Sequence, residues 1–225
     1  MSGPRICTSL AANTIEELLE KASTAMDLGS DLIELRLDFL ETFSVSQIER
    51  FLGSYVKRAI ATLRPVSEGG RFVGPENTRI RLLEELASLP FYLIDVEYKA
   101  ISSNRKLHDS IKRSRRIISW HSLSGTPSIR TMHVIVRNVS IAGAYAKIVT
   151  VANSYEDNVR TLSLYRSRYA KRLIAFCMGD RGVASRFVSA SLGSPIVYCS
   201  LPSEPVAEGQ VSLSLMQEVL RGIRN

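Results

Sequence analysis

Eight short apolar segments alternate along this chain with segments of helical spacing, and this alternation constrains the fold more than any other feature. The strand candidates cover residues 6–10, 31–38, 59–64, 92–98, 117–123, 146–153, 173–178 and 196–201. The helix candidates cover residues 13–28, 44–52, 75–89, 102–112, 127–142, 155–169, 183–192 and 212–223. Eight strand–helix units in 225 residues predict an α/β fold, a (β/α)8 TIM barrel formed by a single domain over residues 1–225. An open doubly wound sheet of about six strands is the alternative.

The composition of the chain argues against a membrane or exported protein. No apolar stretch is long enough for a membrane helix, and the N-terminal residues lead into the first strand candidate without the apolar region of a signal peptide. We therefore expect a cytoplasmic protein with no membrane partner. The cysteines Cys7, Cys177 and Cys199 lie in apolar runs without CxxC or Cys/His metal spacing. We expect buried, reduced thiols and no metal site.

The formal net charge of +7 raises nucleic acid as a partner, because clustered cations bind phosphates. A basic nucleic-acid-binding module is therefore one alternative function. The cations are scattered, however, and the densest run, residues 112–116, lies where a helix candidate ends, a position where cations complement the helix dipole. No aromatic RNA-binding signature accompanies this run. We expect no nucleic-acid partner.

Charged residues interrupt strands that a barrel should bury on both faces. In residues 32–38, Glu34, Arg36 and Asp38 share one face of the strand, and three aliphatic side chains share the other. Because the apolar face must meet the helices, the charged face points into the barrel. The same inward parity holds for Thr62, Arg64, Asp95, Glu97, Ser119, His121 and Lys147. A network of ion pairs that fills the barrel interior would explain any single one of these residues. Inward polar residues on five strands are, by contrast, typical of a barrel active site.

Lys147 is the only charged residue in the apolar segment 146–152. Burial near Arg36 or Arg64 would favour the neutral amine, which is a nucleophile toward a ketone. The alternative is a lysine that extends out of the bottom of the barrel.

His121 and Arg186 also occupy positions that favour a functional role. His121 lies on the strand next to that of Lys147, and its ordinary pKa suits proton transfer near neutrality. A hydrogen-bonded core histidine is the alternative. Arg186 follows the seventh strand candidate at the start of a helix, where barrels commonly bind anions; otherwise it is a surface arginine.

With these motifs in view, the chain resembles type I 3-dehydroquinate dehydratase, an enzyme family of the shikimate pathway, from residue 6 to the C-terminal helix. The matching motifs are Glu34-Leu35-Arg36-Leu37-Asp38, Thr62-Leu63-Arg64-Pro65 with Glu68-Gly69-Gly70, Asp95-Val96-Glu97, Ser119-Trp120-His121 with Thr126-Pro127, Lys147-Ile148-Val149, Met178-Gly179 with Ser185-Arg186, Gly193-Ser194 and Gly209-Gln210. They fall in the family's order on seven of the eight strand–helix units.

The resemblance implies a TIM-barrel carbon–oxygen lyase that dehydrates 3-dehydroquinate, a small anionic cyclic substrate, to 3-dehydroshikimate without a cofactor. Lys147 matches the Schiff-base lysine, His121 the general acid/base, and Glu68 the carboxylate that orients this histidine. The substrate-binding positions are matched by Ser9, Glu34, Arg36, Arg64, Arg186 and Gln210, with Arg186 binding the carboxylate. A Schiff-base class I aldolase on the same barrel is the nearest rival, and it would concentrate its anion contacts on a phosphate.

The chain departs from the family pattern at two places. Ser122 stands where the family usually has aspartate after the histidine, and residues 206–210 read Val-Ala-Glu-Gly-Gln where the family usually has Ser-Ala-Pro-Gly-Gln. The segment 201–209 is expected to act as a lid that brings Gln210 onto the substrate. The sequence does not fix the oligomeric state and leaves a homodimer open.

Overall fold

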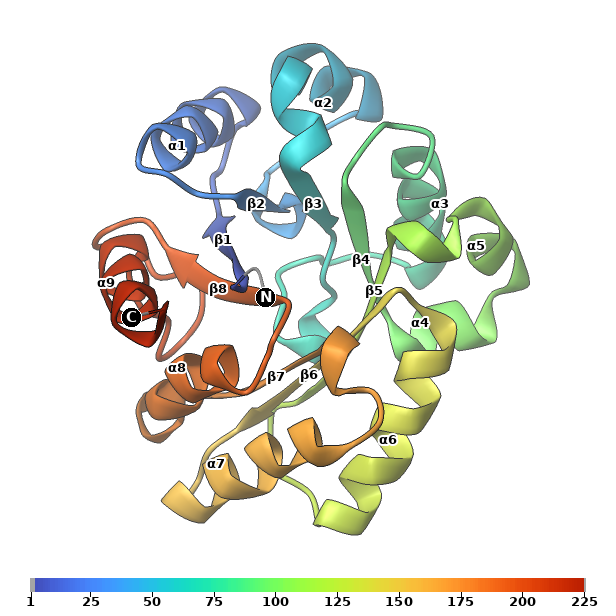
Figure 1. The fold of residues 1–225 in the computed structure, drawn as a ribbon. Coiled ribbons are helices and arrows are strands. Elements are labelled where there is room, and N and C mark those ends of the chain that lie inside the picture. Colours follow the sequence, from blue (N-terminus) through green and yellow to red (C-terminus); the bar gives the residue numbers. More distant parts are fainter. Residues whose placement is uncertain (1–2, 225) are drawn as a thin grey trace.

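The computed structural model describes residues 3–224, which form a nearly closed barrel of eight parallel strands surrounded by helices (Figure 1). The strands are β1 (Arg5–Leu10), β2 (Leu32–Arg36), β3 (Ala59–Thr62), β4 (Leu93–Glu97), β5 (Arg116–Ser122), β6 (Tyr145–Val151), β7 (Leu173–Met178) and β8 (Ile196–Ser200). Their order in the sheet is β7-β6-β5-β4-β3-β2-β1-β8, so β7 and β8 face each other across the gap in the barrel wall. The predicted (β/α)8 barrel is confirmed, and the open doubly wound sheet is wrong.

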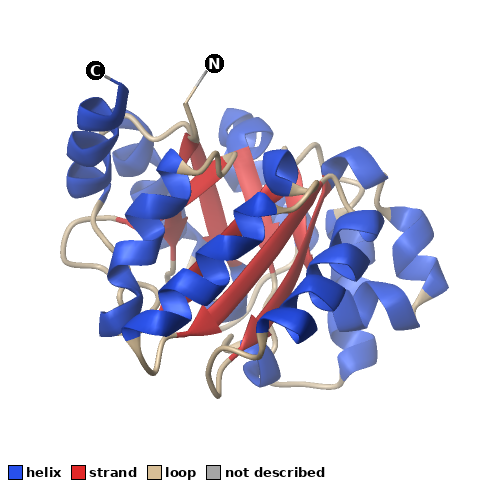
Figure 2. Ribbon diagram, turned by 60° about the horizontal axis from the view of Figure 1, so that its bottom comes forward, coloured by secondary structure: helices blue, strands red, loops and turns tan. Residues whose placement is uncertain are grey.

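The helices pack along the outside of the strands, as the side view shows (Figure 2). The α-helices of the described residues are α1 (Ile15–Asp27), α2 (Val45–Leu52), α3 (Glu76–Leu86), α4 (Tyr98–Ser103), α5 (Arg105–Ser110), α6 (Ile129–Ala142), α7 (Tyr155–Leu162), α8 (Val183–Ser191) and α9 (Leu213–Arg224). Short 3-10 turns lie at η1 (Leu37–Phe39), η2 (Gly53–Arg58), η3 (Val66–Glu68), η4 (Arg113–Arg115), η5 (Ser163–Arg166), η6 (Ala170–Arg172) and η7 (Asp180–Gly182).

Local capping explains where several helices begin and where two predicted boundaries are wrong. The helix predicted from residue 13 starts at Ile15, because the Thr14 side chain caps it by accepting a hydrogen bond from the Glu17 amide. The helix predicted over 102–112 is two short helices. The Asn104 side chain caps the second of them by accepting from the Leu107 amide at 2.8 Å, so the chain turns there instead of continuing.

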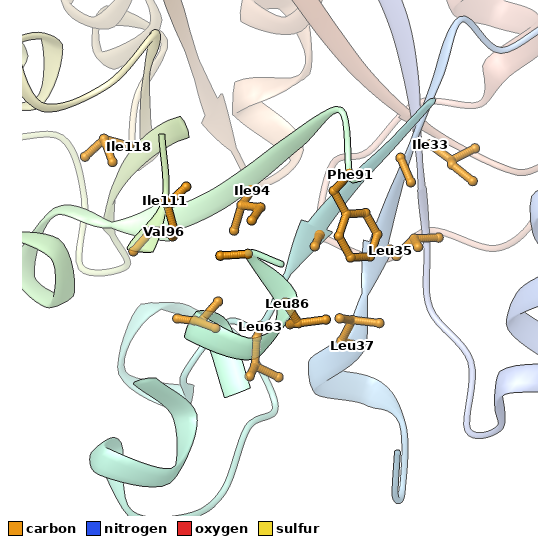
Figure 3. Close-up of a cluster of buried hydrophobic side chains, with 14 of the residues drawn as sticks. Ile33, Leu35, Leu37, Leu63, Leu86, Phe91, Ile94, Val96, Ile111 and Ile118 are labelled. Atoms are coloured by element: carbon orange, nitrogen blue, oxygen red, sulfur yellow. The ribbon is translucent and has the colours of Figure 1, made fainter. Parts of the chain in front are cut away.

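The outward faces of β2, β3 and β4 form one side of the main hydrophobic core (Figure 3). Ile33 and Leu35 of β2 lie there with Ile94 and Val96 of β4, packed against α3 through Leu86. Burying each such side chain contributes about 1.5–3 kcal/mol, so a one-residue slip in register would forfeit this burial and place charged residues against the helices. The core therefore fixes which residues face into the barrel.

The inside of the barrel has an apolar floor and a polar upper layer. The floor is built by Cys7, Leu32, Ile60, Leu93, Ile117, Ile174 and Ile196. Two residues further along β2 and β4, the inward positions hold Glu34 and Asp95. Lys147 of β6 lies at the same level, in register with Ser119 of β5. The polar layer thus lies toward the carboxyl ends of the strands, where the longer loops begin.

Two predictions from composition can be compared with the described residues. Cys7, Cys177 and Cys199 are buried and unpaired, as expected. Among residues 3–224, no helix is both long enough and apolar enough to cross a membrane.

Candidate active site

One pocket at the carboxyl ends of the strands brings together all the side chains that the sequence predicts as site residues. These are Ser9, Glu34, Arg36, Arg64, Glu68, His121, Lys147, Arg186 and Gln210. The rest of the wall, not selected from the sequence as binding positions, is Gly69, Val149, Phe176, Met178, Tyr198, Val206 and Ala207. Strand parity could have found part of this set, since Val149 follows Lys147 by two positions and Met178 follows Phe176 by two.

Lys147 lies in the middle of β6 with 5% of its surface exposed, so it does not extend out of the barrel bottom. Its Nζ donates to Glu34 Oε1 at 3.2 Å and to Asp95 Oδ2 at 3.0 Å, and it lies 4.1 Å from the centre of the Tyr198 ring. Its charged contacts are carboxylates and not the arginines expected from the sequence. The pocket therefore surrounds the lysine nitrogen with groups that stabilise a cation.

Glu34 and Asp95 are held as carboxylates by their neighbours. Burial alone would raise the pKa of Glu34, but Lys147 and Arg36 outweigh it and the pKa lies below its ordinary value. For Asp95, burial is likewise outweighed, here by Arg64 and Lys147, and its pKa is well below the ordinary value. Ser9 Oγ also donates to Glu34 Oε2 at 2.7 Å.

Arg64 follows β3 and is fixed by three groups. Its guanidinium contacts Asp95 Oδ2 at 2.9 Å, Glu97 Oε1 at 2.8 Å and Ser119 Oγ at 2.6 Å. The pKa of Arg64 is raised because these carboxylates outweigh burial. Glu97 also accepts from a second buried arginine, Arg79 of α3, which is not among the predicted site residues.

His121 and Glu68 form a hydrogen-bonded pair, with 3.0 Å between His121 Nδ1 and Glu68 Oε2. Burial, aided by the Glu97 carboxylate, raises the pKa of Glu68 to about 7. Burial also lowers the pKa of His121 well below its ordinary value, and the positive charges of Arg64 and Lys147 act in the same direction. The imidazole is therefore neutral near pH 7 and has one nitrogen able to accept a proton.

The loop that carries Glu68 is pressed against the end of β3. The Gly70 amide donates to the Pro65 carbonyl at 3.0 Å, and a Cβ on Gly70 would lie 2.0 Å from the Arg64 carbonyl oxygen. Only glycine fits this approach, which sets the position of Glu68 relative to the strand. The motif glycine thus has a steric reason.

Arg36 is paired at the end of β2 and not free in the pocket. Its Nε and Nη2 donate to Asp38 at 2.9 and 2.7 Å. The strand predicted over 31–38 is too long at this end, because β2 ends at Arg36 and Asp38 lies on η1. Asp38 also accepts from the Arg71 amide at 2.9 Å. Asp38 therefore joins the end of β2 to the loop that carries Glu68.

Arg186 is a buried guanidinium on α8, with 3% of its surface exposed. It lies 4.5 Å from the centre of the Phe176 ring, its Nη2 donates to the Glu208 carbonyl at 3.3 Å, and its Nε has no hydrogen-bond partner. Burial lowers the pKa of Arg186 to about 10, still far above neutrality. A buried cation with an unused donor at a pocket is suited to bind an anion.

The segment 201–209, predicted to act as a lid, borders the pocket, with Val206, Ala207 and the adjoining Gln210 in the wall. Gln210 does not point its amide freely at the cavity. Its Oε1 accepts from the Val206 amide at 2.8 Å, and its Nε2 donates to the Cys199 carbonyl at 2.9 Å. At the far side of the lid, Lys21 of α1 contacts Glu204 at 2.8 Å. Gln210 thus shapes the lid in this structure.

The donor set of the pocket is one of carboxylates, guanidinium groups and a single imidazole. Within residues 3–224, no group of three or more His, Cys, Asp and Glu side chains is arranged to hold a metal ion.

Comparison with known proteins agrees with this geometry. A family model described as type I 3-dehydroquinase matches residues 6–225. The chain is 37% identical to a 3-dehydroquinate dehydratase of Thermococcus gammatolerans, over 85% of this chain and 87% of the relative, and 32% identical to one of Desulfotalea psychrophila, over 97% and 98%. The crystal structure of the 3-dehydroquinate dehydratase of Aquifex aeolicus superposes with a TM-score of 0.80 at 30% identity, covering 97% of this chain and 98% of that one. The chain belongs to the type I 3-dehydroquinase family.

Proposed function

We propose that the protein dehydrates 3-dehydroquinate to 3-dehydroshikimate, as a carbon–oxygen lyase of the shikimate pathway, through an imine on Lys147. The observation that carries this proposal is the setting of Lys147. It is a buried lysine between two carboxylates, in one pocket with a paired histidine and an arginine suited to an anion. In a member of this family, that arrangement fits a cyclic keto acid.

The reaction balances without a cofactor. The Lys147 ammonium first gives one proton to the neutral His121, and the free amine then attacks the C3 carbonyl of the ring. As one water is lost, His121 returns the proton, which gives a protonated imine that accepts electrons from the adjacent carbon. His121 removes a C2 proton to form an enamine, whose electrons expel the C1 hydroxyl as water with a proton returned by His121. Water then hydrolyses the conjugated imine and restores Lys147. The net change is the loss of one water.

The carboxylates beside Lys147 serve the cationic stages of this sequence. Glu34 and Asp95 contact the lysine nitrogen before reaction, and the protonated imine places a positive charge on the same atom. Because these two carboxylates are already in place around the nitrogen, they need not move when the cationic imine forms. Their role is to stabilise the imine as an electron sink.

The histidine pair supplies the base in the correct tautomer. When Glu68 is ionised, it accepts the hydrogen on Nδ1 of His121, at the observed 3.0 Å, and leaves Nε2 as the base. The low pKa of His121 keeps the ring neutral and ready to take a proton near pH 7. Glu68 then stabilises the imidazolium that forms.

The remaining polar groups bind the substrate. The unused donor of Arg186 suits the ring carboxylate, while Arg64, Arg36, Glu34, Ser9 and Gln210 line the same pocket and match family positions that hold the hydroxyls or make polar contacts. A single guanidinium without a carboxylate partner suits a singly charged acid better than a phosphate. This favours dehydration over the aldolase alternative.

Addition of 3-dehydroquinate to the purified protein tests the proposal. Ultraviolet absorbance of a conjugated enoate should grow with the wild-type protein and with Lys171→Ala, which changes an exposed lysine before β7, and it should not grow with Lys147→Ala. No absorbance growth with the wild type, or equal turnover by Lys147→Ala, would reject the proposed function.

A further inference from the structure

Arg79 is a charged residue on the core-facing side of α3, which lies outside the barrel wall (Figure 1). The other buried residues of this helix are Ile80, Leu83 and Leu86, and Arg79 itself has 1% of its surface exposed. A guanidinium at such a position is costly to bury unless carboxylates and carbonyls satisfy it. Its partners therefore show what it is there to hold.

Those partners lead directly to the pocket. Arg79 Nη1 donates to Glu97 Oε2 at 2.6 Å, and the other oxygen of the same carboxylate accepts from Arg64 at 2.8 Å. Arg79 Nη1 also donates at 2.9 Å to the carbonyl of Leu63, the residue before Arg64 in the chain. Arg79 thus fixes the neighbourhood of Arg64 at two points, its carboxylate partner and its preceding peptide.

The charges of this buried array balance only when Arg79 is counted. The buried carboxylates joined by these ion pairs are Glu34, Asp95 and Glu97, and the buried cations are Lys147, Arg64 and Arg79. Without Arg79, Glu97 would have Arg64 as its remaining cationic contact in the array, and Arg64 would be drawn toward it and away from Asp95. Glu76, half exposed at the surface, contacts Arg79 at 2.6 Å and ends the chain of ion pairs.

We propose that Arg79 is a positioning residue: by sharing Glu97, it holds the Arg64 guanidinium in the orientation in which Arg64 meets the substrate. The inference rests on the proposed function, because it concerns the binding of the same substrate. Arg79 itself contacts no atom of the substrate and acts through Glu97 and Leu63.

Arg79→Met should raise KM for 3-dehydroquinate and lower kcat/KM by about 10- to 100-fold, the usual effect of losing a group that orients a contacting residue. The value of kcat should change less, because Lys147 keeps its contact with Glu34. A merely structural role would reduce the fraction of folded enzyme, which lowers the apparent kcat and leaves KM unchanged. Arg81→Met is the matched control, since Arg81 is exposed on the same helix.

A second-site change tests the route of the effect. In Arg79→Met/Glu97→Gln, the neutral amide at position 97 no longer attracts the Arg64 guanidinium as a charge would. KM should therefore return to within about threefold of the wild type. A double-mutant cycle measures this coupling between positions 79 and 97. Arg79→Lys, which keeps the charge, should also stay within about threefold. If Arg79→Met does not fold, Arg79→Gln takes its place with the same expected rise and rescue.

The outcomes separate this inference from the proposed function. If the wild type turns over the substrate, two results would overturn the role of Arg79 and leave the proposed function intact. One is an unchanged KM in folded Arg79→Met, and the other is a raised KM that Glu97→Gln does not rescue. Absence of turnover in the wild type would overturn both. A raised KM that is rescued by the second change is the result that we expect.

Discussion

Replacement of Glu68 by glutamine should remove the main ionisation that controls the rate near neutral pH. The pKa of Glu68 is raised to about 7 by burial, and its carboxylate contacts His121 Nδ1 at 3.0 Å. Below this pKa, the carboxyl is protonated and can donate to Nδ1, so that the hydrogen of the imidazole moves to Nε2 and the base is lost. In the wild type, kcat/KM should therefore fall about tenfold for each pH unit below 7 and reach a plateau above it.

In Glu68→Gln, the amide oxygen accepts from Nδ1 at every pH, so the inflection near pH 7 should disappear. The loss of charge should also lower the plateau. A charge-assisted hydrogen bond is about twice as strong as a neutral one, and the difference of about 1–1.5 kcal/mol corresponds to a plateau about 5- to 13-fold lower.

The assay is the pH dependence of kcat/KM, followed by enoate absorbance, for the wild type, Glu68→Gln and the control Glu41→Gln, which changes an exposed carboxylate. An inflection near pH 7 that persists in Glu68→Gln would assign the ionisation to another group. A wild-type profile that is flat between pH 5 and 8 would show that the ionisation of Glu68 does not control His121 as the base.

Three further substitutions test separate parts of the site. His121→Ala should lower kcat by about 10²–10⁴-fold in steady-state kinetics, whereas a loss confined to KM would indicate a binding role. Arg186→Ala should raise KM by about 10- to 150-fold, because it removes a charged hydrogen bond of about 1.5–3 kcal/mol. If its KM equals that of the exposed control Arg221→Ala, the substrate carboxylate binds elsewhere. Glu208→Pro should lower KM about two- to fivefold, because the turn over 207–210 has Gly209 at φ 69°, a geometry that favours proline before the glycine. A higher KM would show that proline does not fit the lid.

The inward direction of the charged residues followed from the sequence because strands alternate strictly. With Ile33 and Leu35 required in the core, Glu34 and Arg36 had to face the barrel interior, and the structure places them there. The glycines Gly69-Gly70 were also recognised locally, as part of a family motif, and the structure gives the reason for one of them: Gly70 is needed for the close approach to Arg64. Patterns of this kind depend on neighbours in the chain.

Features that depend on contacts between distant segments were not predictable in this way. Parity placed Lys147 inside the barrel but could not show that Glu34 and Asp95, and not arginines, would reach its nitrogen. The hydrogen bonds that turn the Gln210 amide toward the backbone depend on the folded lid. Arg79 did leave a signal, since it shares helical spacing with Leu83 and Leu86, but its partner Glu97 lies on the following strand.

Trapping of the imine shows whether Lys147 forms a covalent bond with the substrate. The protein is treated with borohydride during turnover of 3-dehydroquinate, digested, and examined by mass spectrometry. If Lys147 forms the imine, a reduced ligand adduct should be found on the peptide that contains Lys147, and no adduct should form in the absence of substrate. An adduct on a different lysine, or full turnover without any adduct, would contradict an imine on Lys147.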